Sequence, residues 1–265
     1  MRHPRHAAAA LLAAAWLVLP ARGFAQHTDW LHVVEDGALV AGITDYETVT
    51  QTVGVRALHV RFPSGYLTNS PGWTGASSPP AGYSPLPGNT ALSFNVVVPP
   101  TLGRNFSYWN GVGAVAFGPL PNGERLRFQQ NSTFNPGDVN AIATGGSSQV
   151  PGFAIATTSP TGFLHHHIHY RLLGNGVDLA TNGVYLVSVE ATMPGLADSL
   201  PMYVVYNQGG TDAAGNLALE WVNANLVSTP VPVLPGAARV GLALALLLGL
   251  ALALLPLNAT PEFRR

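Results

Sequence analysis

One short segment concentrates the residues that could bind a metal ion. Phe163–Leu172 holds four histidines within five positions. Side chains of a β-strand alternate between its two faces, so His165, His167 and His169 are expected on one face, about 6.5–7 Å apart. Two imidazoles at this spacing can tilt toward one ion, which needs ring nitrogens about 2.0–2.1 Å away. The segment therefore predicts a metal site on a strand. A solvated polar face is the alternative interpretation.

A tetrahedral ion needs further ligands from elsewhere in the chain. His27 and Asp29 lie at the start of the expected mature protein, where a terminal segment can lie across a sheet edge. His59 falls on the polar face of an alternating run and is either a ligand or a surface histidine. Zinc is the expected ion, although imidazole also accepts copper, nickel and iron. The candidate ligands are His27, Asp29, His59, His165, His167 and His169.

The charge distribution also favours a cation. The chain has 265 residues with 12 basic and 13 acidic side chains, and it contains no cysteine and no lysine. Residues 26–235 hold six of the arginines and 12 of the acidic residues, a formal charge of −6. The absence of cysteine excludes disulfides, thiolate zinc sites and cysteine nucleophiles. The scarcity of basic side chains excludes a broad nucleic-acid surface, so no nucleic-acid partner is expected.

Both ends of the chain have the character of targeting segments. Residues 1–25 combine an arginine-containing start, an apolar stretch and small residues before a cleavage point after Ala25, which predicts a helical signal peptide. Residues 230–265 contain an uninterrupted apolar run, which predicts a transmembrane helix at about 240–257, followed by a basic tail. The remaining body, 26–229, is expected outside the cytoplasm with the membrane as its anchor.

A proline-rich segment precedes this predicted helix. Val231–Pro235 reads Val-Pro-Val-Leu-Pro, and the apolar run and the basic tail follow it. The arrangement resembles the sorting signals of exosortase-processed bacterial proteins, the PEP-CTERM type. This resemblance implies a cell-envelope protein, processed by an exosortase-type enzyme, that stays anchored by the helix or is released to the surface after sorting. A plain membrane anchor is the alternative.

The body consists of short β-rich runs separated by Pro, Gly and Asn turn signals. Many short strands with such turns predict an all-β fold, a β-sandwich or jelly-roll. No amphipathic helix is expected, and residues 69–89, rich in Pro, Gly and Ser, are expected to form a long surface loop. The expected strands are Trp30–Val34, Val55–Phe62, Ala91–Val98, Arg125–Gln129, Phe153–Thr157, Phe163–Leu172, Val184–Thr192, Met202–Tyr206 and Ala218–Val227.

Motifs at both ends of the body form a second pattern. His27–Asp29 precedes Glu35–Leu39, and His167–Tyr170 precedes Gly183–Ala191. The pattern resembles bacterial surface proteins of the choice-of-anchor type and related PEP-CTERM proteins repressed by the zinc-uptake regulator. Those families carry an early His-x-Asp and a His-x-His strand before a Gly-x-Tyr-x-Val strand. They are associated with metal acquisition in the envelope, which implies a metal-uptake system as partner. The resemblance implies ligand roles for His27, Asp29, His167 and His169.

No enzyme motif accompanies the histidines. The sequence lacks the His-Glu-x-x-His, Gly-x-Ser-x-Gly, phosphate-loop and dinucleotide-binding patterns, and no glutamate follows the His-x-His pair at the spacing of a cupin. The leading prediction is a non-enzymatic, exported zinc-binding protein, anchored at the membrane or surface, that acts as a metal reservoir or delivery protein. The alternatives are a cupin-like metalloenzyme and a structural adhesion or matrix protein in which the histidines are incidental.

Overall fold

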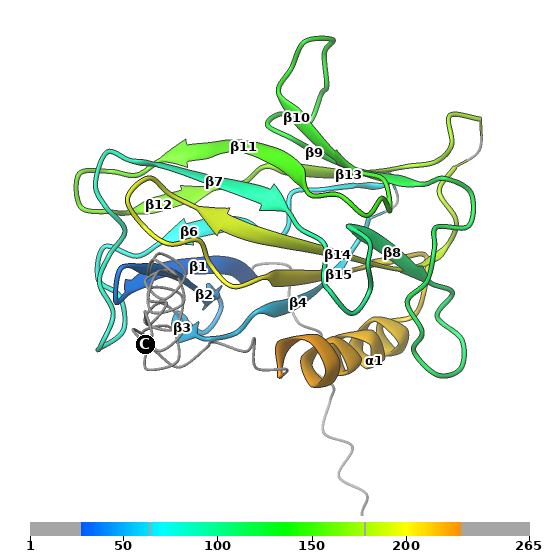
Figure 1. The fold of residues 1–265 in the computed structure, drawn as a ribbon, viewed down its shortest axis with the longest axis horizontal. Coiled ribbons are helices and arrows are strands. Elements are labelled where there is room, and N and C mark those ends of the chain that lie inside the picture. The colour runs from blue at the N-terminus through cyan, green and yellow to red at the C-terminus, as the bar shows by residue number, and fades with distance from the viewer. Residues whose placement is uncertain (1–27, 64, 178, 229–265) are drawn as a thin grey trace, which may run out of the picture.

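The protein is described by a computed structural model that covers residues 28–228 apart from 64 and 178 (Figure 1). This part of the chain is mostly β, with 43% of it in strands and 8% helical, which confirms the predicted all-β class. The predicted signal peptide (1–25) and transmembrane helix (240–257) lie outside the described residues, as does the end of the body at 229. Within the described residues, no helix is both long enough and apolar enough to cross a membrane.

Fifteen strands and one α-helix are defined in the described chain. The strands are β1 (Thr28–Glu35), β2 (Ala38–Asp45), β3 (Thr50–Val53), β4 (Ala57–Arg61), β5 (Leu67–Thr68), β6 (Trp73–Gly75), β7 (Ala91–Val96), β8 (Phe106–Trp109), β9 (Arg125–Gln129), β10 (Asn140–Ala143), β11 (Val150–Thr157), β12 (Leu164–His166), β13 (His169–Leu173), β14 (Gly183–Thr192) and β15 (Met202–Gln208). Seven of them coincide with predicted runs, with ends shifted by a few residues, namely β1, β4, β7, β9, β11, β14 and β15. Six strands were not predicted, namely β2, β3, β5, β6, β8 and β10.

The strands form three sheets, of which the five- and six-stranded ones are mixed and the four-stranded one is antiparallel. A five-stranded sheet has the order β12-β6-β1-β2-β3, and a four-stranded sheet has the order β10-β9-β13-β5. The third sheet has six strands, β11-β7-β14-β15-β4 with β8 beside β14. The pairs β1–β6 and β15–β4 are parallel, whereas the other neighbours are antiparallel.

A single large hydrophobic cluster joins the three sheets. Trp30 from the five-stranded sheet, Phe128 from the four-stranded sheet and Tyr206 from the six-stranded sheet are all essentially inaccessible to solvent. Strand β9 alternates between buried and half-buried residues over most of its length, whereas β1 and β15 are buried on both faces. The core therefore fixes the relative positions of the strands that carry the histidines.

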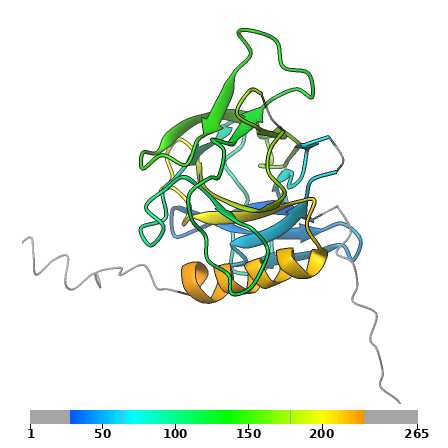
Figure 2. The same ribbon diagram turned by 90° about the vertical axis from the view of Figure 1, so that its right-hand side faces the viewer.

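A helix stands where a strand was predicted, so the prediction of a strand at Ala218–Val227 is wrong. Helix α1 (Asp212–Val222) continues into a π-helical turn, Asn223–Val227. The Thr211 side chain accepts a hydrogen bond from the Ala214 backbone N–H and caps the first turn. The helix buries Ala218 and Val222 on the outer face of β4, β14 and β15, a spacing of four that is typical of a helix. It runs on the opposite side of the molecule from the β9–β10 hairpin (Figures 1 and 2).

The histidine-rich segment also differs from the prediction. Instead of one strand over Phe163–Leu172, the chain forms β12, which pairs with β6, and β13, which pairs with β9 in another sheet. The transfer between sheets occurs around Ile168, whose side chain is fully buried. The period of two also predicts His166, Ile168, Tyr170 and Leu172 on the core face; the last three are buried, whereas His166 is half-buried. The alternation of buried and more exposed residues therefore continues across the break between β12 and β13. It does so because the apolar residues near this break pack into the core.

The prediction of a surface loop at 69–89 is wrong for the first part of this segment. Residues 71–76 are buried, and Trp73–Gly75 forms β6 between β1 and β12. A three-residue strand flanked by proline and glycine gives no detectable alternation, so its pairing depends on its neighbours. The position of β6 brings residues near 70 next to the first strand and next to the histidines.

Candidate metal centre

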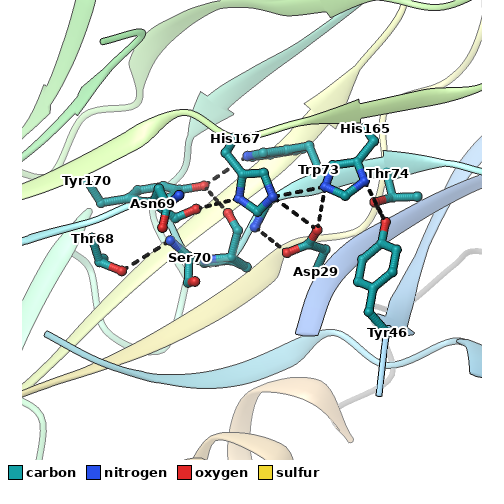
Figure 3. Close-up of polar contacts among 12 residues, drawn as sticks. Asp29, Tyr46, Thr68, Asn69, Ser70, Trp73, Thr74, His165, His167 and Tyr170 are labelled. Atoms are coloured by element: carbon teal, nitrogen blue, oxygen red, sulfur yellow. Dashed lines mark hydrogen bonds and ion pairs between the residues drawn. The ribbon is translucent and has the colours of Figure 1, made fainter. Parts of the chain in front are cut away.

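Asp29 lies on β1 and turns its carboxylate toward the loop that precedes β6. Only 2% of its side chain is exposed. Its Oδ1 accepts a hydrogen bond from the backbone N–H of Gly72 at 2.8 Å, and the Gly72 carbonyl accepts one from the Trp30 N–H at 2.9 Å. These two bonds fix the carboxylate so that Oδ2 points away from the loop and toward the histidines (Figure 3).

His165 enters the same space from β12. Its backbone lies opposite Thr74 on β6, so the two side chains share one face of the five-stranded sheet. Its Nδ1 is 3.1 Å from the hydroxyl of Tyr46, and that hydroxyl is 2.8 Å from Oγ1 of Thr74. Burial raises the pKa of Tyr46, with a smaller contribution from Asp29, so the phenol keeps its proton at neutral pH. The pair Tyr46 and Thr74 thereby orients the ring and leaves Nε2 to face Asp29.

His167 lies in the link between β12 and β13. Its Nδ1 is 2.9 Å from the backbone carbonyl oxygen of Asn69. A carbonyl can only accept a hydrogen bond, so Nδ1 carries the proton and Nε2 of the neutral ring offers a lone pair. A ligating histidine is commonly fixed in this way by a carbonyl on its other nitrogen. The Asn69 carbonyl therefore selects the tautomer that can bind a metal through Nε2.

The three side chains converge on one point. Nε2 of His165 and Nε2 of His167 are 2.9 Å apart, and they lie 3.5 and 3.6 Å from Oδ2 of Asp29. These are the separations of atoms that share a tetrahedral ion, for which bonds of about 2.0–2.1 Å place ligands about 3.3 Å apart. The circle through the three atoms has a radius of about 1.9 Å, slightly less than such a bond. One ion could therefore bond to all three atoms, which face one another in Figure 3.

The negative charge of Asp29 also favours a cation bound to this group. The Asp29 carboxylate is buried, and its ion-pair partners among the described residues are the two histidines. A buried carboxylate without a positive partner costs several kcal/mol, because the protein replaces its hydration poorly. Either a protonated imidazole or a metal ion can supply the positive charge. Two lone-pair nitrogens 2.9 Å apart repel each other unless a proton or an ion lies between them.

Gly72 makes the close approach of these groups possible. A Cβ atom at this position would lie 2.5 Å from Cε1 of His167 and 2.7 Å from Oδ2 of Asp29. Any other residue would therefore occupy the space between the loop and the two ligands. The glycine is needed here because the backbone passes directly beside the site.

Buried aromatic residues hold the loop that carries Asn69 and Gly72. The Tyr170 hydroxyl donates to the Pro71 carbonyl at 2.8 Å and accepts a hydrogen bond from Nε1 of Trp73 at 2.9 Å. Both side chains belong to the large core cluster. The loop is thus tied to the interior, which holds the Asn69 carbonyl beside His167 (Figure 3) and the Gly72 N–H beside Asp29.

The structure brings together three of the six predicted ligands. His169 lies on β13 with Nδ1 3.3 Å from the Gln130 carbonyl oxygen and is not part of the group. His59 lies on β4 beneath α1, where its ring contacts Gly215 and its Nδ1 is 3.1 Å from Oδ1 of Asn216. Burial lowers the pKa of His59. His27 lies outside the described residues.

Sequence reasoning did not identify the groups that orient the ligands. Tyr46 follows β2, Asn69 and Gly72 lie in the loop before β6, and Thr74 lies on β6. Tyr46 and Asn69 are 119 and 98 residues from the histidines they orient, and Gly72 is 43 residues from Asp29, so no local spacing marks any of them. Only the glycine next to Trp73 is an unusual signal, since glycine beside a strand can mark a close backbone approach.

The chain was also compared with known proteins. No protein-family model matches it, and neither the curated proteins nor the solved structures contain a match. The candidate site is therefore interpreted from its own geometry and chemistry.

Proposed function

We propose that this protein binds one divalent transition-metal ion, zinc in the first place, through Asp29, His165 and His167. The observation that carries the proposal is the triangle formed by one carboxylate oxygen and two imidazole nitrogens, with edges of 2.9, 3.5 and 3.6 Å. The second polar atom of each ligand already has a hydrogen-bond partner, namely Gly72, Tyr46 and Asn69. Such partners are typical of metal centres because they fix the ligand orientation.

The accessibility of the ligands supports a role in holding and releasing metal. The side chains of His165 and His167 are 37% and 31% exposed, whereas Asp29 is enclosed. Structural zinc sites generally use four protein ligands, whereas three ligands leave a position for water or for a ligand from another molecule. We therefore propose a non-enzymatic metal reservoir or delivery protein. His27 remains a predicted further ligand, supported by its position two residues before Asp29.

The proposal also covers the location of the protein and its partners. The body is proposed to be a β-sandwich-type domain, exported by the signal at 1–25 and held in the cell envelope by the apolar segment at 240–257. The resemblance of 230–265 to PEP-CTERM signals supports an exosortase-type enzyme as a processing partner. A metal-uptake system is the proposed recipient of the ion.

Zinc binding by the full-length chain tests the proposal. Equilibrium dialysis should give one ion per chain with a Kd below about 10 µM. Asp29→Asn keeps the shape but removes the charge and should weaken binding at least about tenfold. Asp212→Asn is the matched control, because Asp212 pairs with Arg61 at the start of α1. Binding weaker than about 10 µM in the wild type, or equal affinity in Asp29→Asn, contradicts the proposal.

A second candidate function is favoured by the ligand set itself. Two histidines and one carboxylate with open positions also bind Fe(II) in non-haem oxygenases. This supports the metalloenzyme alternative, although the sequence lacks the glutamate expected for a cupin. Oxygen consumption after anaerobic loading with Fe(II) tests it. With ascorbate as reductant, sustained consumption well beyond the single oxidation of the bound Fe(II), absent in the His165→Ala, His167→Ala double variant, would support an enzyme. Consumption no greater than that single oxidation would contradict this candidate.

A further inference from the structure

A group of arginines lies on the outer face of the four-stranded sheet, apart from the metal centre. Arg125 and Arg127 alternate along β9 with the core residues Leu126 and Phe128. Arg171 on β13 lies directly opposite Arg127. Side chains opposite each other in an antiparallel pair have Cβ atoms about 4.5–5.5 Å apart, and diagonal neighbours are about 7–8 Å apart. The three guanidinium groups therefore extend from one small area of the sheet.

These positive charges have no acidic partner within the described residues. The arginine–carboxylate ion pair found there is Arg61 with Asp212, on β4 and α1. Arg125 donates instead to the Gly174 carbonyl at 3.4 Å. Like charges opposite each other destabilise a sheet, yet this area holds three of the six arginines of residues 26–235, which carry a formal charge of −6. The grouping therefore places a local positive field on an acidic domain.

Arg127 is fixed in position although its hydrogen bonding is incomplete. Its guanidinium carbon lies 4.1 Å from the ring centroid of Phe134, which comes from the β9–β10 loop. Its Nε is buried and has no hydrogen-bond partner among the described residues. Burial lowers the pKa of Arg127, and the charges of Arg125 and Arg171 lower it further. The stacked ring holds the guanidinium plane in place, while the neighbouring positive charges make an anion favourable beside it.

We propose that Arg125, Arg127 and Arg171 form a binding site for a phosphate group, either free or carried by a lipid headgroup. A guanidinium presents several N–H donors in a planar fork and binds phosphate oxygens in bidentate fashion. Three such groups on one face match a ligand with several oxygens and up to two negative charges. The site lies on different strands from Asp29 and His165 and does not depend on a metal ion.

Calorimetric titration of the full-length chain, with a chelator present, tests this site with two probes. One probe is inorganic phosphate, and the other is glycerophosphoglycerol, the water-soluble headgroup of an anionic lipid. We expect saturable binding of at least one probe that weakens as salt concentration rises. Preference for glycerophosphoglycerol identifies a lipid headgroup as the source, and equal or stronger binding of inorganic phosphate identifies the free ion.

Substitutions locate the binding. Arg171→Gln and Arg127→Gln should each weaken phosphate binding about tenfold or more, because each removes a charge-assisted hydrogen-bond donor. Arg61→Gln is the control, since it removes an exposed arginine on β4 and should leave binding unchanged. If Arg127→Gln lowers the thermal unfolding midpoint, Arg125→Gln replaces it in the comparison. No saturation by either probe at about 10 mM, or equal affinity in the arginine variants and the wild type, overturns the proposal.

Discussion

The described chain places histidines in two contrasting environments. His165 and His167 are partly exposed and converge with Asp29, each with Nδ1 held by another group. His32 is fully buried and His59 is half-buried beneath α1, and these two are called the enclosed pair. His32 stacks on Trp73 with ring centroids 5.1 Å apart, and His59 packs against Gly215 beneath α1. The number of histidines is therefore a poor guide to a metal site. A nearby carboxylate, a fixed tautomer and an open approach distinguish the converging pair from the enclosed pair.

The largest expected effect comes from removing the converging pair. His165→Ala with His167→Ala should lower zinc affinity at least about 100-fold, because two of three ligands are lost. His59→Ala should leave the affinity within about twofold, because His59 lies outside the group. Dialysis against labelled zinc measures both. A similar loss in His59→Ala would show that the two environments do not differ in function.

The enclosed histidines should instead govern stability in acid. Burial lowers the pKa of His32 to about 4, with partial compensation by the backbone of Thr74. The unfolded chain binds this proton near pH 6.5, so the free energy of unfolding should fall as pH drops from about 6.5 to 4, by about 3 kcal/mol in total. His59 acts in the same direction, because burial also lowers its pKa. Denaturant unfolding of the chelated protein at several pH values measures this dependence.

His32→Phe keeps a ring beside Trp73 but cannot bind a proton. The variant should therefore lose the part of the pH dependence that arises from one histidine. A variant whose unfolding free energy changes with pH as steeply as that of the wild type would mean that His32 is not protonated on unfolding in this range.

A substitution at Gly72 tests how closely the backbone approaches His165 and His167. Gly72→Ala places a methyl group 2.5–2.7 Å from His167 and Asp29. We expect at least about tenfold weaker zinc binding and a loss of about 1–3 kcal/mol in the free energy of unfolding. Gly118→Ala is the matched control, because a Cβ there meets nothing within 4 Å. Unchanged zinc binding by Gly72→Ala would indicate that the loop can move away from the ligands.

The smallest effect should come from the groups that orient the rings. Tyr46→Phe removes the hydroxyl beside Nδ1 of His165 and should weaken zinc binding about tenfold. Asn216→Ala removes the corresponding partner of His59 and should leave zinc binding unchanged. Parallel zinc titrations of the two variants measure how much the hydrogen bond at Nδ1 of His165 contributes to zinc affinity. Equal affinities would assign Tyr46 a purely structural role.

Local sequence patterns predicted the parts of the fold that depend on alternation. The inward positions of Ile168, Tyr170 and Leu172 follow from a period of two, and the β-rich runs locate most of the long strands. The helix at Asp212–Val222 escaped prediction because its apolar leucine and alanine residues also fit a short strand. Its capping threonine was the available signal.

The site was predictable only in part, because its pieces come from distant segments. The period of two places His165 and His167 on one side of the chain, and Asp29 was suggested by its position near the expected mature N-terminus. The exclusion of His169 from the group follows from the passage of the chain into another sheet, which is a tertiary event. The roles of Tyr46 and Asn69 likewise depend on pairing between strands far apart in sequence.

X-ray absorption spectroscopy of the zinc-loaded, full-length protein tests the metal centre most directly. A centre built from Asp29, His165 and His167 predicts one zinc ion per chain, with at least two imidazole nitrogens and one or more oxygens at about 2.0–2.1 Å. A shell of oxygens alone, or one with fewer than two imidazoles, would contradict a metal centre at these three residues.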